Sequence, residues 1–253
     1  MIEDIMTIAG DAYRDATRRK IVVYLLLLIA IAEVSVFSLY DEISFQSANK
    51  LVTDAGLAMT LLVGVLSALS VAFQVPKELR DRTAMTLFAK PLGREAYLLG
   101  KALGASFLVM RNCGIVALGI LLVFNFKGIS GEALILGFLQ SFLLVLVTAI
   151  DCIALALLLS LFLSEGAVAL AIFVVLFVGN ASYMWSVSES GVASVAGILK
   201  YILPNFYLLD IKSEVAAGLK ISGSYLALAA GYGLSYAVML VCVSITVFKR
   251  RDL

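Results

Sequence analysis

The chain has 253 residues, of which 62% are hydrophobic and 15% are charged, and its mean hydropathy is +1.04. A soluble domain is about half apolar and about a quarter charged, so this composition excludes an ordinary soluble globule. The formal net charge of +1 gives no reason to expect binding to nucleic acid. The sequence therefore indicates a protein whose apolar surface is covered by lipid.

The chain contains no histidine, which removes the commonest metal ligand and the usual general base of hydrolases. The three cysteines, Cys113, Cys152 and Cys242, each stand inside an apolar run. They are typical of small buried hydrophobic residues rather than of a disulfide framework. We therefore expect no catalytic residue, no metal site and no cofactor on this chain.

Six apolar stretches are long enough to cross a bilayer, which takes roughly 20 residues per helix. They cover residues 21–40, 56–75, 102–126, 133–163, 166–185 and 225–248. We predict an all-α integral membrane protein with a cytoplasmic segment at residues 1–20 and a six-helix transmembrane domain at residues 21–253. The fourth stretch is overlong, which predicts a tilted or protruding helix. Residues 1–20 contain acids and lack a small-residue cleavage motif, so the first stretch is not a removable signal peptide.

Lysine and arginine are distributed unequally between the two sides of this topology. Thirteen lie with the termini and with the turns after the second and fourth stretches: Arg14, Arg18, Arg19, Lys20, Lys77, Arg80, Arg82, Lys90, Arg94, Lys101, Lys249, Arg250 and Arg251. Five lie on the other side: Lys50, Lys127, Lys200, Lys212 and Lys220. Because cytoplasmic loops carry the excess of basic residues, both termini are predicted to be in the cytoplasm of a multi-pass inner-membrane protein.

Residues 1–20 have the pattern of an amphipathic helix. One sector of about 100° holds Ile2, Ile5, Met6, Ala9, Tyr13 and Ala16, and the charged residues lie outside it. Such a helix is expected to lie along the cytoplasmic membrane surface. It serves either as a topology anchor or also as a support for a cytoplasmic partner.

Residues 76–95 form the second cytoplasmic segment. Pro76 is placed to open a short helix, and Pro91 and Gly93 are placed to end one. Met85 and Phe88 are apolar but lie outside the membrane, so they need a surface to pack against. The alternative is an ordinary basic loop that lies against the lipid headgroups.

Residues 186–223 are predicted to be extracytoplasmic. They contain two moderately apolar pieces, 192–203 and 205–220, that are separated by Pro204. Each piece is too short to span the bilayer, so we expect a short helical hairpin, re-entrant or interfacial, that is buried in protein before the last span.

Three groups of residues carry a resemblance to a known family. They are the run Ile8-Ala9, Tyr13-Arg14-Asp15-Ala16 and Arg18-Arg19-Lys20; the segment Lys77-Glu78, Arg82-Thr83, Lys90-Pro91-Leu92-Gly93-Arg94 and Tyr97-Leu98-Leu99-Gly100-Lys101; and the ending Phe248-Lys249-Arg250-Arg251-Asp252-Leu253. With these residues the chain resembles the permeases of type 2 ATP-binding cassette (ABC) exporters. The most similar group is that of the permeases for multicopper-enzyme or nitrous oxide reductase maturation.

The resemblance implies a separate cytoplasmic ATPase, present in two copies, that binds ATP and Mg²⁺ and docks on a dimer of permeases. It matches Glu78, Arg80 and Arg82 to the charged positions that contact the ATPase, and we expect the apolar Met85 and Phe88 to take part in the same docking and coupling. The sequence independently lacks a phosphate-binding loop, because its single Gly-Lys pair, Gly100-Lys101, has Glu95 and Ala102 where the motif needs Gly and Ser or Thr. The spacing of Gly100 and Gly104 allows close helix approach but is common by chance.

Three ionisable residues lie within predicted spans: Glu33, Arg111 and Asp151. Each costs roughly 2.5 to 3.5 kcal/mol near a helix centre, so partners are expected. Their distances from the cytoplasmic ends are similar, about 15 to 21 Å, which allows Arg111 to bridge an acid. The cluster is either a structural pair or the lining of a translocation or proton path.

The sequence thus favours a non-catalytic permease subunit that couples a separate ATPase to substrate movement or mechanical work. The alternatives are a proton-coupled secondary transporter that uses Glu33 and Asp151, and a membrane scaffold that relays ATPase work to a periplasmic or lipoprotein partner. The pattern of residues leaves the substrate, and the identity of the second permease copy, open.

Overall fold

The computed structural model describes residues 2–18, 45–80, 93–128, 131–180 and 203–250, with isolated positions between 27 and 38. Within these ranges every regular element is a helix, which confirms the predicted all-α class. In chain order they are α1 (Ile2–Arg18), α3 (Phe45–Ala72), α4 (Gln74–Arg80), α6 (Arg94–Phe126), α7 (Glu132–Ser160), α8 (Glu165–Asn180), the 3₁₀-helix η2 (Phe206–Leu209), α11 (Lys212–Ala216) and α12 (Gly223–Arg250).

Four helices in the described part are long and apolar enough to cross a membrane: Lys50–Glu78, Arg94–Phe126, Leu134–Ser160 and Gly223–Arg250. They correspond to the second, third, fourth and sixth predicted stretches. The fifth stretch contains α8, which has 16 residues and is shorter than a usual span. The first stretch, 21–40, lies outside the described residues apart from isolated positions.

Two of these helices begin earlier than hydropathy predicts. Helix α6 begins at Arg94 rather than at residue 102, and α3 begins at Phe45 rather than at residue 56. The first turns of α6 contain Arg94, Glu95 and Lys101, and Ala96, Tyr97 and Leu98 between them are buried. Because this polar stretch packs against protein, a scan for lipid-facing residues does not detect it.

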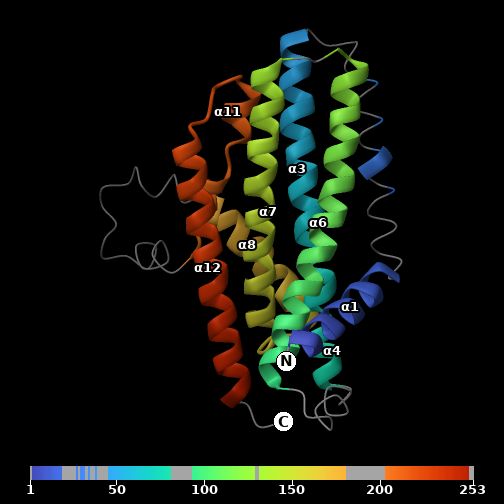
Figure 1. Cartoon of the computed structure of the whole chain (residues 1–253), viewed down its shortest axis with the longest axis vertical. Coiled ribbons are helices and arrows are strands. Elements are labelled where there is room, and N and C mark those ends of the chain that lie inside the picture. Colours follow the sequence, from blue (N-terminus) through green and yellow to red (C-terminus); the bar gives the residue numbers. More distant parts are fainter. Residues whose placement is uncertain are drawn as a thin grey trace.

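The long helices α12, α7, α3 and α6 lie side by side, and α8 lies behind α7 (Figure 1). Helix α7 is central, since it packs against both α3 and α12 and fully buries Leu144, Ala149 and Ala156. Helix α1 crosses α6 at the end of the bundle that also holds α4 and the end of α12 (Figure 1). The start of α1 and the end of α12 therefore lie at the same end, which we call the terminal end.

Small residues allow α1 to lie directly on α6. A Cβ atom at Gly104 would lie 2.7 Å from the carbonyl oxygen of Ala9 and 2.9 Å from Cβ of Ala12. A Cβ atom at Gly100 would lie 2.7 Å from the side chain of Ile8. Glycines four residues apart let two helix backbones approach closely, so this spacing has a structural use here.

The buried face of α1 differs in part from the predicted apolar sector. Ala9 and Ala16 are buried, but Ile2 and Met6 are exposed. Ile8 and Ala12, which the prediction omits, are buried instead. The difference arises because α1 packs on the protein through its smallest side chains, whereas hydropathy alone ranks the larger ones first.

Residues 204–216 enter the bundle from the end opposite the termini. Val215 contacts Gly137 near the start of α7, whereas Leu209 lies beside Val147 and Gly233. Because Gly137 and Val147 are ten residues apart on one helix, the segment reaches about 15 Å into the bundle. The predicted helical piece 205–220 is wrong in detail, since it is divided into η2, α11 and turns. Phe206, Leu209, Ile211 and Val215 are buried in protein, whereas residues 217–220 are exposed. The piece 192–203 lies outside the described residues except for its last position.

Tyrosines of α12 bond to the irregular backbone of this segment. The amide of Asn205 donates a hydrogen bond to the hydroxyl of Tyr232 (2.9 Å), and the hydroxyl of Tyr225 donates to the carbonyl of Leu208 (2.9 Å). Non-helical backbone is tolerated inside a membrane protein only where such partners satisfy it.

The close contact between α1 and α6 predicts that a larger side chain destabilises the protein at Gly104 but not at a glycine outside this contact. Gly104→Val should lower the free energy of unfolding by about 1 to 3 kcal/mol, because the side chain would overlap the α1 backbone. Trypsin should also cut faster after the exposed Arg14 of α1. Gly114→Val is the matched control, because nothing lies within 4 Å of a Cβ atom there. Equal effects at the two positions in thermal unfolding and in limited proteolysis would contradict the α1 packing.

Candidate functional site

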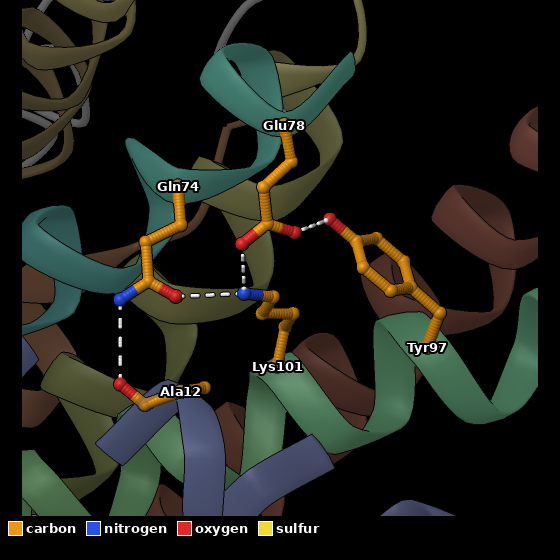
Figure 2. Close-up of polar contacts among 5 residues, drawn as sticks. All are labelled: Ala12, Gln74, Glu78, Tyr97 and Lys101. Atoms are coloured by element: carbon orange, nitrogen blue, oxygen red, sulfur yellow. Dashed lines mark hydrogen bonds and ion pairs between the residues drawn. The ribbon is translucent and has the colours of Figure 1, made fainter. Parts of the chain in front are cut away.

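A buried lysine organises the polar residues at the terminal end. Lys101 of α6 is 5% exposed, and its Nζ donates hydrogen bonds to Oε1 of Gln74 (2.7 Å) and to Oε1 of Glu78 (2.6 Å). Gln74 and Glu78 are four residues apart on α4, so one face of that short helix presents both acceptors (Figure 2). The ion pair fixes the position of α4 against α6.

Tyr97 completes the coordination of Glu78. Its hydroxyl donates to Oε2 of Glu78 (2.6 Å), so both carboxylate oxygens accept hydrogen bonds from α6 (Figure 2). The Lys101 ammonium also lies 5.7 Å from the centre of the Tyr97 ring. Tyr97 and Lys101 are themselves one turn apart, so two polar pairs with helical spacing face each other across the α4–α6 contact.

The same group reaches α1 through Gln74. Its Nε2 donates to the carbonyl oxygen of Ala12 (3.3 Å), as Figure 2 shows. We call Gln74, Glu78, Tyr97 and Lys101 the Lys101 cluster. It joins α1, α4 and α6 at the point where the chain leaves the Lys50–Glu78 span.

The first turn of α6 also holds the end of α12. The Nη1 atom of Arg94 donates to the carbonyls of Phe248 (3.3 Å) and Lys249 (3.1 Å), which lie in the last turn of that helix. Glu95 forms an ion pair with Lys249, and the rings of Tyr97 and Phe248 stack 5.9 Å apart. Tyr97 therefore contacts both α4 and α12.

The predicted docking residues fall into two groups. Glu78 points into the Lys101 cluster, and Arg80 is exposed at the end of α4. Arg82, Met85 and Phe88 lie outside the described residues. The docking role of all five stays a prediction, whereas the role of Glu78 in holding α4 on α6 is a finding.

Gln74, Tyr97 and Lys101 have no site role in the sequence-based prediction. A signal for them exists, because polar residues spaced four apart occur on both sides of the segment 81–92. The signal becomes specific only when α6 is known to extend back to Arg94.

Arg111 connects helices through neutral partners. Its Nη1 donates to the hydroxyls of Tyr13 (3.2 Å) and Thr17 (3.3 Å) of α1, and its Nε and Nη2 donate to Oδ1 of Asn112 (3.1 and 2.8 Å). Asn112 in turn donates to Ser67 of α3 (2.8 Å). Asp151 is not the partner of Arg111, since neither of its carboxylate oxygens has a hydrogen-bond partner among the described residues. Glu33 lies outside the described residues, so a bridge from Arg111 to an acid stays a prediction for Glu33.

Asp151 lies on another face of the bundle. It is 1% exposed, neither carboxylate oxygen has a hydrogen-bond partner, and Oδ2 faces Gly233 of α12. In the described part of the chain, no group of three or more His, Cys, Asp and Glu side chains is arranged to hold a metal ion.

Removing the charge of Lys101 should be costly. Lys101→Met leaves the Glu78 carboxylate partly buried without its cation, so we expect the free energy of unfolding to fall by about 2 kcal/mol or more. Adding Glu78→Gln should recover part of the loss, because no unpaired charge then remains. The matched control is Lys77→Met, since Lys77 is exposed on α4. Denaturation of the purified wild type, of the Lys101→Met and Glu78→Gln single variants, of the double variant and of Lys77→Met measures these differences. A double variant whose loss of stability equals the sum of the two single losses would argue against the pair.

The sequence matches a known protein family over almost its whole length. The family described as "ABC-2 family transporter protein" matches residues 6–253, which includes every helix given above except the first turn of α1. No individual curated protein matches the chain. Members of this family are membrane permeases that in general work as dimers with an ATPase partner. The chain belongs to the ABC-2 transporter family and is a multi-pass membrane permease component of an ABC transporter.

Proposed function

We propose that this permease couples ATP hydrolysis by a separate cytoplasmic ATPase to substrate movement or mechanical work across the membrane. The Lys101 cluster carries the proposal. It bonds α4, which leads directly into residues 81–92, to α6 and α1, and Tyr97 continues the contact to Phe248 of α12. A displacement of α4 is therefore passed to three helices through short polar contacts and one ring stack.

ATP and Mg²⁺ belong to the partner in this proposal. The single Gly-Lys pair of the chain lies within α6, and its Lys101 already donates to Gln74 and Glu78. A lysine that binds phosphate must be free to reach it from a glycine-rich loop. The helical position and the buried ion pair both argue against nucleotide binding by this residue.

The charge pattern supports the sidedness of the proposal. The terminal end carries α4, the ends of α1 and α12, and the exposed Arg80, and we place it in the cytoplasm because basic residues are concentrated there. The exposed Ile2 and Met6 of α1 fit an amphipathic helix that contacts the membrane surface. The segment 81–92, with Arg82, Met85 and Phe88, then faces the ATPase.

Three finer features belong to the same proposal. They are six spans, a second permease copy that is either identical or related, and membership in the group of multicopper-enzyme or nitrous oxide reductase maturation permeases. Helix α8 is short, and the apolar Leu170 and Phe177 on its outer face are highly exposed. These residues favour contact of this helix with lipid or with another protein chain.

Docking is tested by charging the apolar residues of the segment. Met85→Asp combined with Phe88→Asp should abolish co-purification of the ATPase from native membranes in mild detergent, because two carboxylates would be buried at the contact. The amount of permease in the membrane should be unchanged. A count of co-eluting chains per permease is the measurement.

The conservative pair Met85→Leu and Phe88→Leu is the control and should retain the ATPase. Full recovery of the ATPase with the aspartate variant would remove this segment as the dock. Nucleotide hydrolysis by the purified permease alone would refute the division of labour itself.

A further inference from the structure

Asp151 is the buried charged residue that the coupling route does not use. It lies on α7, is 1% exposed, and both of its oxygens lack a hydrogen-bond partner. Its Oδ2 is directed at α12, 3.1 Å from the place where a Cβ atom would stand at Gly233. The carboxyl group is thus enclosed in the contact between α7 and α12.

Among the described residues, no charged donor compensates this carboxyl group. The backbone N–H of Ala237 on α12 interacts with it but carries no charge. An ionised carboxylate in an apolar setting is far more costly than a neutral one when no partner is present. The titratable neighbours that interact with it are Tyr236 of α12 and Cys152 of α7, and neither carries a positive charge.

The charged pair of the segment 204–216 does not supply the missing partner. Lys212 is bound to Asp210 (3.1 Å) and lines a narrow gap beside Thr148, one turn of α7 away from Asp151. The residue of that segment that reaches the Asp151 contact is the apolar Leu209. The carboxyl group therefore faces apolar atoms on the side of this segment as well.

The size of the contact determines which ligand fits. A Cβ atom at Gly233 would lie 2.4 Å from Val147 as well as beside Asp151, so even one carbon atom has no space there. A metal ion would need several oxygen ligands, and a hydrogen-bonding organic group would need still more volume. A proton requires neither several oxygen ligands nor additional volume.

Helix α12 is also the least buried of the four described spans. It buries 22% of its most apolar window, compared with 61% for the α7 span. At the terminal end it is tied to α6 through Arg94 and Tyr97, which belong to the route of force described above. Few buried neighbours favour local separation of an element, so among the four described spans α12 is the one whose displacement disturbs the least packing.

We propose that Asp151 is a proton-binding site that links protonation to the contact between α7 and α12. The carboxyl group carries its proton while the helices are packed; when α12 separates, the O–H proton passes to water and a solvated carboxylate remains. The link between this separation and the ATPase rests on the proposed function, whereas the proton site itself does not.

The first test uses the purified permease without a partner. The packed state binds a proton that the unfolded chain gives up, so the stability of the wild type should fall as the pH rises. Asp151→Asn has the shape of the protonated acid and cannot ionise. Its thermal midpoint should exceed that of the wild type by about 3 °C or more near pH 8, and the difference should shrink towards about pH 5. Parallel pH profiles of the two proteins would overturn the proton site.

The second test asks whether the site works in transport. In the complex with its ATPase, Asp151→Asn should lower the permease-dependent ATPase rate at least about fivefold, with the amount of bound ATPase unchanged. Ser141→Ala is the matched control, because Ser141 of α7 is also buried and its hydroxyl also lacks a partner. If Asp151→Asn is more stable than the wild type near pH 8 but retains the full permease-dependent ATPase rate, the role of Asp151 is structural. This result would refute the link between protonation and transport.

If the Asp151→Asn variant does not fold, Asp151→Leu replaces it in both tests, because leucine has a similar volume and fits the apolar surroundings. It should show the same loss of pH dependence and the same loss of coupling. Loss of the ATPase from the wild-type complex would be a failure of the proposed function, and the pH profile of the isolated permease would still decide the proton site.

Discussion

The ammonium group of Lys101 imposes the strictest constraint at the terminal end of this permease. A buried lysine is stable only when its N–H groups find acceptors, and here those acceptors are Gln74 and Glu78 of α4. The pairing holds α4 against α6 and so sets the direction in which the chain leaves the Lys50–Glu78 span. Because Tyr97 bonds the second oxygen of Glu78, α4 is held at two points and resists rotation about a single bond.

The position of α1 follows from the same stretch of α6. Gly100 and Gly104, adjacent to Lys101, let the α1 backbone approach, and the carbonyl of Ala12 then comes within reach of Gln74. Further along α6, Arg111 bonds to Tyr13 and Thr17. Helix α6 thus contacts α1 by shape at its glycines and by hydrogen bonds from Arg111, and both kinds of contact agree with one placement of α1.

The sequence predicts what composition controls and misses what depends on pairing in space. The apolar runs locate α3, α6, α7 and α12, because lipid selects for hydropathy over about 20 residues. The same criterion starts α6 too late, since the turn of Tyr97 packs on protein. It also gives residues 205–220 as one helical piece, although Leu209 and Val215 fit into separate contacts on α7 and α12. The depths of Arg111 and Asp151 along their helices can be counted from the sequence, but the faces on which they lie cannot. The sequence therefore does not show that Arg111 bonds to Tyr13, Thr17 and Asn112 rather than to Asp151.

The two buried charged residues of the described bundle are treated in opposite ways, and this difference has a mechanical consequence. Lys101 has its charge compensated at the end where α12 is tied to α6, while Asp151 has no compensation at the contact of α12 with α7. Phe248 and Gly233, which mark these two contacts, are 15 residues apart on α12, about 22 Å along a straight helix. A small rotation about the fixed end would therefore move the helix several times farther at Gly233 than near Phe248. In the proposed coupling, a force received at α4 would therefore displace α12 farther at the Asp151 contact than at the Phe248 contact.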